Sequence, residues 1–367
     1  MKLCESMLGD RLARIEIGEF LNSIAWETRT DYINWIAEKG NDYDKSLKWW
    51  MSLFGDKNTL VNPLFLAICQ LELVKRLIER RESLLLVCEE WKVLKLIHDN
   101  LNKLAIKAIV VRKSVFDSLF YNLRLRARFV KNWLQSGLYY LDLVTTARKT
   151  KRESGRAMSI DNKKPTAIIH TCVDELSLGE DGVLRDRYFP GLSDWLVKQG
   201  YQVLNIPFPY NIKRTNYDLF NWFRNSKNTF LLAEDYFTFS SVFKSLKPIL
   251  GSFSVPKGDL NFKAFHLGSL ITDLRYTQAS NLNNLRFLIY SHIVKDLYLN
   301  GLNLQLFIDK FENMPKEKPQ LMALRKYFPN CTSIGFQHAS LPPFMLKYTS
   351  TNEQFERGLF QDLIVAN

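Results

Sequence analysis

The sequence predicts an α/β protein built on a Rossmann-like parallel sheet. Short apolar runs rich in β-branched residues alternate with helical stretches of ten or more residues, which is the order in which strand–helix–strand units form such a sheet. The chain has 367 residues, of which 46% are hydrophobic and 13% aromatic. A chain of this size can bury a sizeable core in one large domain with insertions, or in two domains.

The first part of the chain is expected to be helical. Apolar residues recur three and four positions apart at 19–40 and 63–80, and Pro63 suits the first turn of the second helix. The pattern then changes to a short apolar run at 83–90, a helical stretch at 91–104 and a run typical of a strand at 105–111. We therefore expect a helical N-terminal region at 1–80 and a Rossmann-like domain at 81–361.

The strand–helix alternation resumes at residue 166. Strands are expected at 166–175, 201–208, 302–309 and 331–337, and helices at 188–200, 282–301 and 317–328. Gly200 and Gly301 end two of these helices, as glycine commonly does. A last apolar run at 362–367 has no helix after it, although a parallel sheet is usually covered on both faces. We expect this run to begin a second Rossmann-like domain that is not present.

Cysteine use and hydropathy favour a cytoplasmic protein. The five cysteines lie far apart and form no CxxC pair, which favours reduced thiols. The first 20 residues carry charges too frequently for a signal peptide, and no window holds 18 uninterrupted apolar residues.

The net charge of +12 is concentrated in one segment. Between residues 112 and 152 there are ten Lys/Arg and two acidic residues, with apolar side chains at roughly helical spacing beside them. We expect a helical insertion at 112–155. One interpretation is contact with an anionic membrane surface; the other is a helical hairpin packed on the domain with a solvated basic face. Nucleic acid is disfavoured because no binding motif accompanies the charge. The candidate membrane contacts are Arg124, Arg126, Arg128 and Lys131.

Polar residues collect where the predicted strands end, and ligands bind at the carboxyl ends of strands in open parallel sheets. Most of the candidates follow such strands, whereas Glu234 stands in the stretch 233–237. Each also has a plain structural interpretation: Asp174 as a helix cap, His338 as a core histidine with satisfied hydrogen bonds, Glu234 as the start of a helix. The candidates are Asp174, Glu175, Arg185, Asp186, Glu234, Glu312, Asn313, Gln337, His338 and Ser340.

Several site types lack their motifs. The sequence contains no GxGxxG after the first strand, no GxxxxGK[ST] and no GxSxG, and its five histidines show no metal-ligand spacing. Ordinary dinucleotide, P-loop and serine-hydrolase chemistry are therefore disfavoured. We expect no metal and no bound cofactor.

Residues 307–348, FIDKFENMPKEKPQLMALRKYFPNCTSIGFQHASLPPFMLKY, followed by QDLIVAN at 361–367, resemble bacterial surface-carbohydrate transferases of the O-antigen or capsule type. The blocks at 57–77, 181–208 and 230–243 support the resemblance, which spans most of 45–367. It implies a GT-B glycosyltransferase, in which two Rossmann-like domains face a cleft. The main departure is that the donor-binding second domain would begin past Asn367. In this interpretation Gly335 permits close packing, and Gln337 and His338 face substrate.

The resemblance implies transfer of a sugar from a nucleotide-sugar donor to a surface polysaccharide or a lipid-linked acceptor, at the inner face of the cell membrane. Two alternatives are a CDP-polyol phosphotransferase of the same architecture and a non-catalytic, membrane-associated binding module. An acceptor hydroxyl needs a base, and the leaving phosphate needs positive or amide groups. The candidate bases, which the sequence does not rank, are Glu175, Asp186, Glu312 and His338. The candidate substrate-binding residues are Asp174, Arg185, Glu234, Asn313, Gln337 and Ser340.

Overall fold

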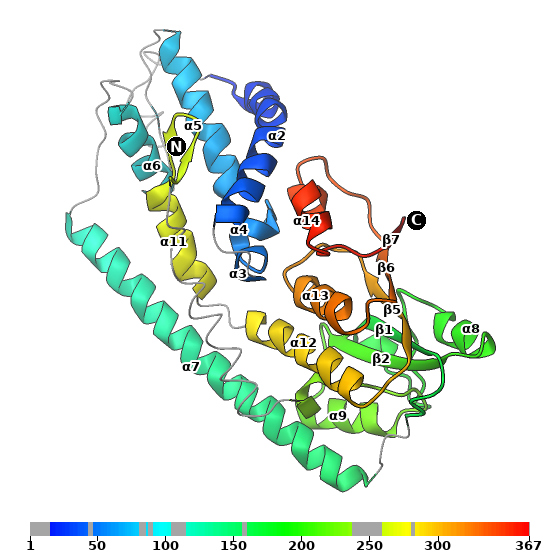
Figure 1. Ribbon diagram of the computed structural model, residues 1–367. Coiled ribbons are helices and arrows are strands. Elements are labelled where there is room, and N and C mark those ends of the chain that lie inside the picture. The colour runs from blue at the N-terminus through cyan, green and yellow to red at the C-terminus, as the bar shows by residue number, and fades with distance from the viewer. Residues whose placement is uncertain are drawn as a thin grey trace.

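A computed structural model describes residues 15–42, 47–80, 86, 91–103, 115–155, 160–236, 259–279 and 283–366. They form a region of helices and, beside it, a five-stranded parallel sheet with helices packed on it (Figure 1). The predicted class, an α/β protein of Rossmann-like type, is confirmed.

The sheet places its strands in the order β2-β1-β5-β6-β7, and every neighbouring pair is parallel. Numbered along the chain, this is the 2-1-3-4-5 order of doubly wound sheets. All eight residues of the interior strand β1 are buried, as expected of a parallel strand covered on both faces. The strands are β1 (Thr166–Val173), β2 (Gln202–Pro209), β5 (Leu304–Lys310), β6 (Thr332–Gln337) and β7 (Leu363–Ala366).

Helices cover the two faces of this sheet. On one face α12 (Asn283–Leu299) and α13 (Glu317–Tyr327) share a core with Ile168, Leu204 and Phe307. On the other face α8 (Leu192–Lys198) packs with Ala167 and Ile169. The predicted strands from 166 onward and all three predicted helices are present, and Gly200 and Gly301 follow α8 and α12 with φ of 90° and 75°. Both angles lie in the left-handed region that favours glycine.

The helical region has its own core. The helices predicted at 19–40 and 63–80 are α2 (Gly18–Asp42) and α5 (Leu64–Glu79), and the stretch 91–104 gives α6 (Trp91–Lys103). The helices share their core with later segments of the chain and with Phe311, Leu346 and Phe360 from the sheet region. The sequence interpretation did not foresee α3 (Leu47–Trp50), α4 (Leu53–Asp56), α11 (Gly268–Ala279) or the antiparallel pair β3 (Asn261–Phe262) and β4 (Phe265–His266).

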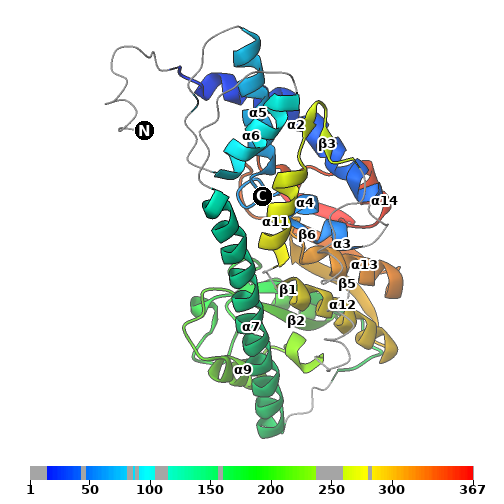
Figure 2. The same ribbon diagram turned by 90° about the vertical axis from the view of Figure 1, so that its left-hand side faces the viewer.

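The basic insertion is one continuous helix, α7 (Val115–Ser154), of 40 residues. The helical insertion is therefore present, but the hairpin, one of the two interpretations of this segment, is wrong because the helix has no break between its basic and aromatic stretches. The helix runs past both the helical region and the sheet (Figure 2) and contacts α11, η3 (Ala233–Tyr236) and α9 (Asn216–Asn225). Among the described helices, none combines the length and the apolar character needed to cross a membrane.

Three sequence predictions fall outside the described residues: the strand at 83–90, apart from Leu86, the strand at 105–111 and the helix following Tyr236. The run at 362–367, which was expected to begin a second Rossmann-like domain, gives β7, which pairs with β6 in parallel as the fifth strand of the same sheet. All four of its residues are exposed, so this edge of the sheet is uncovered by the described chain.

Candidate functional site

The order of the strands defines where a ligand would meet the sheet. The chain crosses from one half of the sheet to the other between the neighbouring strands β1 and β5, and ligands of open parallel sheets bind outside the carboxyl ends of the strands at this reversal. Three segments follow strands at this edge: Asp174–Ser177 after β1, 311–318 after β5 and 338–340 after β6.

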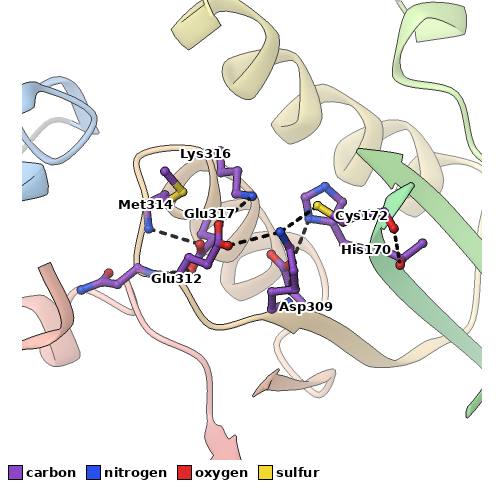
Figure 3. Close-up of polar contacts among 10 residues, drawn as sticks. His170, Cys172, Asp309, Glu312, Met314, Lys316 and Glu317 are labelled. Carbon is purple, nitrogen blue, oxygen red and sulfur yellow. Dashed lines mark hydrogen bonds and ion pairs between the residues drawn. The ribbon is translucent and has the colours of Figure 1, made fainter. Parts of the chain in front are cut away.

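Lysine and glutamate side chains form a connected chain after β5 (Figure 3). Lys310 Nζ lies 2.9 Å from Cys172 Sγ on β1 and donates a hydrogen bond of 3.3 Å to Glu312 Oε1. The other carboxylate oxygen, Glu312 Oε2, lies 3.2 Å from Lys316 Nζ. The side chains of both lysines are at most 4% exposed and that of Glu312 is 20% exposed. We call Cys172, Lys310, Glu312 and Lys316 the lysine–glutamate chain.

In the lysine–glutamate chain, Lys310 and Glu312 stabilise each other's charged form. Burial alone would raise the pKa of Glu312, but Lys316 and Lys310 outweigh it and lower that pKa to about 2. Burial opposes the charge on Lys310, but Glu312, Cys172 and Asp309 together outweigh it, so the pKa of Lys310 is raised. Lys316 Nζ also lies 4.2 Å from the ring centroid of Phe208 on β2, a favourable position for a cation. Lys310 is therefore held as a cation at the edge of the sheet, and the Lys316 side chain lies beside the same carboxylate.

His338 lies beside this chain, directly after β6. Its ring meets the Tyr188 ring edge to face, with centroids 4.9 Å apart, and the charges of Glu312 and the nearby lysines act on it. Partial desolvation and these lysines lower the pKa of His338, and only Glu312 opposes them. The imidazole is exposed. It is therefore both accessible to solvent and neutral at pH 7.

The rest of the β6 terminus is simpler. Gln337 is half-buried and its Nε2 donates a hydrogen bond of 3.3 Å to the Ala339 carbonyl, while Ser340 is exposed. A Cβ atom on Gly335 would lie 3.1 Å from Phe311 Cβ and 3.1 Å from Gln361 Cδ. The close packing expected of Gly335 is confirmed.

Asn313 has a structural environment. The residue is buried, and its φ of 49° directs the chain from β5 into α13. Its backbone N–H donates to Glu317 Oε2 at 3.0 Å, its side-chain amide donates to the Lys347 carbonyl, and its side-chain oxygen accepts from Lys318. Burial raises the pKa of Glu317 and lowers that of Lys318. The amide of Asn313 is thus used within the protein and positions the loop that carries Glu312.

The candidates after β1 are held by protein contacts. Asp174 caps η2 (Glu175–Ser177) by accepting from the Ser177 N–H at 2.9 Å, as the alternative interpretation predicted, and pairs with Arg187 at 2.5 Å. Glu175 pairs with Arg214 at 2.6 Å, and that hydrogen bond lowers the pKa of Glu175.

Three further candidates lie on loops or short turns. Asp186 Oδ1 accepts from the backbone N–H groups of Tyr188 and Phe189, at 2.8 and 2.9 Å, and so fixes the turn that presents Tyr188 to His338. Arg185 is largely exposed and lies 3.6 Å from Asp181. Glu234 is buried on η3, which packs against α7 and α12.

The structure also pairs residues that the sequence interpretation did not connect. His170 Nδ1 lies 3.1 Å from Asp309 Oδ1, both side chains are 1% exposed, and the two residues are directly opposite in the β1–β5 register. Contacts between distant segments likewise bring Lys316, Cys172 and Tyr188 into the site. The one available sequence signal was the cluster Lys310-x-Glu312-x3-Lys316, in which opposite charges stand close together just after a predicted strand.

Among the described residues, no group of three or more His, Cys, Asp or Glu side chains is placed to hold a metal ion. Comparisons of the chain with protein-family models, curated proteins and solved structures found no match. The class that the described residues define is therefore a doubly wound α/β protein with a charged site at the switch point of its sheet.

Proposed function

We propose that the protein is a glycosyltransferase of the GT-B type that moves a sugar from a nucleotide-sugar donor to a surface polysaccharide or a lipid-linked acceptor. The doubly wound sheet and the charged edge between β1, β5 and β6 support this, together with the sequence blocks described above. The uncovered strand β7 suits an architecture in which a further element packs on this edge. The described domain would hold the acceptor, in the cytoplasm at the inner face of the cell membrane.

The observation that carries the proposal is the exposed imidazole of His338 beside the lysine–glutamate chain. In an inverting transfer, the acceptor oxygen forms a bond to the anomeric carbon while the bond from that carbon to the donor phosphate breaks. The electron pair of that bond leaves with the nucleotide, and the acceptor proton must pass to a base. A neutral imidazole accepts this proton at pH 7.

The other three candidate bases are poorer acceptors. Glu312 has a pKa of about 2, so its carboxylate binds a proton weakly. Glu175 is tied to Arg214, and Asp186 accepts two backbone N–H groups. In the proposed mechanism Glu312 instead keeps Lys310 charged and holds both Lys310 and Lys316 in place, where they stabilise the leaving phosphate.

The substrate-binding candidates divide by their freedom to reach a ligand. Arg185, Gln337 and Ser340 have side chains at or near the surface, and we assign them to substrate contact. Asp174 and Asn313 are engaged in caps and loop hydrogen bonds, so their proposed role is to position the loops. Glu234 is buried and receives no direct role in this proposal.

The proposal is tested on protein expressed from its complete reading frame. The assay measures nucleotide release from a panel of nucleotide sugars, with and without candidate acceptor lipids. His338→Ala is expected to lower kcat/KM by at least about a hundredfold, the usual contribution of a general base. For the wild type, kcat/KM should fall in acid as the imidazole becomes protonated, and the midpoint of this fall should lie below the ordinary imidazole value of 6.5 because the pKa of His338 is lowered. His98→Ala, on α6, is the matched control and should keep full activity.

Product analysis separates this proposal from its alternatives. A CDP-polyol phosphotransferase of the same architecture releases CMP and leaves phosphorus in the product, whereas a glycosyltransferase leaves none. A binding module turns over no donor at all. Full activity in His338→Ala, with the fold verified by circular dichroism, would refute the assigned base.

A further inference from the structure

An apolar row runs along the outward side of α7. Its six described side chains are between 52% and 68% exposed. They lie within roughly 40° of one line along the helix axis and extend over about 30 Å, given 100° and 1.5 Å per residue. We call this set the apolar stripe: Phe120, Leu123, Val130, Leu134, Leu138 and Leu141.

The opposite side of α7 packs on the protein. Leu143 and Ala147 are buried in a core with α9, and Thr150 accepts a hydrogen bond of 3.1 Å from Arg224 on that helix. These three residues lie roughly opposite the apolar stripe on the helix. The helix is therefore docked on α9 through one side, and by helical geometry the apolar stripe lies on the side away from that contact.

Basic side chains border the apolar stripe on both sides. Arg124 and Lys131 lie roughly 60–80° to one side of its centre line and Arg126 about 80° to the other, by the same helical geometry. All three are exposed. The fourth sequence candidate, Arg128, has a side chain outside the described residues. Single exposed apolar residues are ordinary, but a continuous row of them marks an interaction surface.

The charge decides which partner fits. Within Val115–Ser154, eight Lys/Arg stand against three Asp/Glu, so a second copy of the helix would meet like charge. A nucleic acid would satisfy the basic residues but leave six apolar side chains without a partner. A bilayer with anionic lipids satisfies both, since basic side chains reach the phosphates while their apolar neighbours enter the acyl region.

We propose that α7 lies in the surface of an anionic membrane, with the apolar stripe inserted and Arg124, Arg126 and Lys131 contacting lipid phosphates. The helix lies on the bilayer and does not cross it. The inference does not depend on the transferase reaction, because lipid binding is measured without turnover. A failure of one proposal therefore leaves the other standing.

Liposome co-sedimentation of the full chain tests it, with phosphatidylcholine vesicles compared with vesicles that also contain roughly 30% phosphatidylglycerol, an anionic surface. Two variants should each weaken binding to anionic vesicles by roughly tenfold or more. One changes the apolar stripe, Leu134→Ser/Leu138→Ser, and the other reverses the bordering charges, Arg124→Glu/Arg126→Glu/Lys131→Glu. The control Lys163→Glu/Lys164→Glu/Lys198→Glu changes the same charge at exposed lysines of the sheet region and should bind as the wild type does.

All substituted side chains are exposed, so the variants are expected to fold, and circular dichroism checks this. Equal binding to neutral and anionic vesicles, or full binding by both α7 variants, overturns the proposal. A different result would assign the apolar stripe to a second copy of the chain: the wild type self-associates and does not bind vesicles, and Leu134→Ser/Leu138→Ser abolishes the self-association. RNA binding lost on charge reversal, without vesicle binding, would assign the helix to nucleic acid.

Discussion

Lys57 Nζ donates a hydrogen bond of 2.9 Å to Gln354 Oε1, joining two residues that are 297 positions apart. The same ammonium donates to the Thr349 carbonyl at 2.5 Å. Lys57 is 1% exposed, and burial lowers its pKa to about 7. The contact ties the helical region to the segment around α14 (Asn352–Glu356), which follows β6 in the chain.

Lys57→Met is expected to reduce the free energy of unfolding by about 2 kcal/mol, because one buried and one partly buried acceptor lose their donor. Urea unfolding followed by circular dichroism measures the change. Lys75→Met is the control: its pair with Glu79 is partly exposed, and its loss should cost less than about 0.5 kcal/mol. Equal midpoints for the two variants would mean that the Lys57 contact contributes nothing to stability.

Two glycines should respond oppositely to alanine. Gly335→Ala places a Cβ atom 3.1 Å from Phe311 Cβ, and we expect a loss of about 1–2 kcal/mol of stability from overpacking. Gly137, inside α7, has nothing within 4 Å of its added Cβ, and Gly137→Ala should gain about 0.5–1 kcal/mol. Thermal unfolding of both variants tests this, and a destabilising Gly137→Ala would argue against the continuous helix.

Glu312 should contribute stability that depends on pH. Its folded-state pKa of about 2 lies below the ordinary 4.5, so the ion-paired carboxylate stabilises the fold above pH 4.5 and loses this contribution as the pH falls toward 2. The shift corresponds to about 3 kcal/mol. In urea unfolding between pH 7 and pH 3, Glu312→Gln should be less stable than the wild type near neutrality, and the difference between them should narrow as the pH falls toward 3. Glu180→Gln, at an exposed site, should follow the wild type at every pH.

The pKa of His338 should depend on the charges of the neighbouring side chains. Lysines lower the pKa of His338 and Glu312 raises it, so Glu312→Gln should lower this pKa further and Lys310→Met should raise it. Proton NMR of the imidazole Cε1–H signal, assigned with His338→Ala, gives the titration directly. Shifts of the same sign in both variants would contradict the electrostatic arrangement of the site.

The sequence by itself determined the local elements of the sheet region. Apolar runs such as 166–173 become strands, and helices ending at Gly200 and Gly301 lie where periodicity and glycine predicted them. It also located Glu312, His338 and the basic helix, because strand ends and charge clusters are local features. Such features depend on residues within one or two turns, so a linear pattern contains them.

Only the tertiary structure decided which of these residues meet. The pairing of His170 with Asp309, and the contact of Lys310 with Cys172, join strands more than 130 residues apart. Asp174 had two interpretations in the sequence, as a site residue and as a helix cap, and only the fold showed that its carboxylate caps η2. The side of α7 that packs on α9 was likewise undecided, since several faces of that helix carry apolar residues. The physical reason is that desolvation and ion pairing depend on distances in space, which local periodicity does not contain.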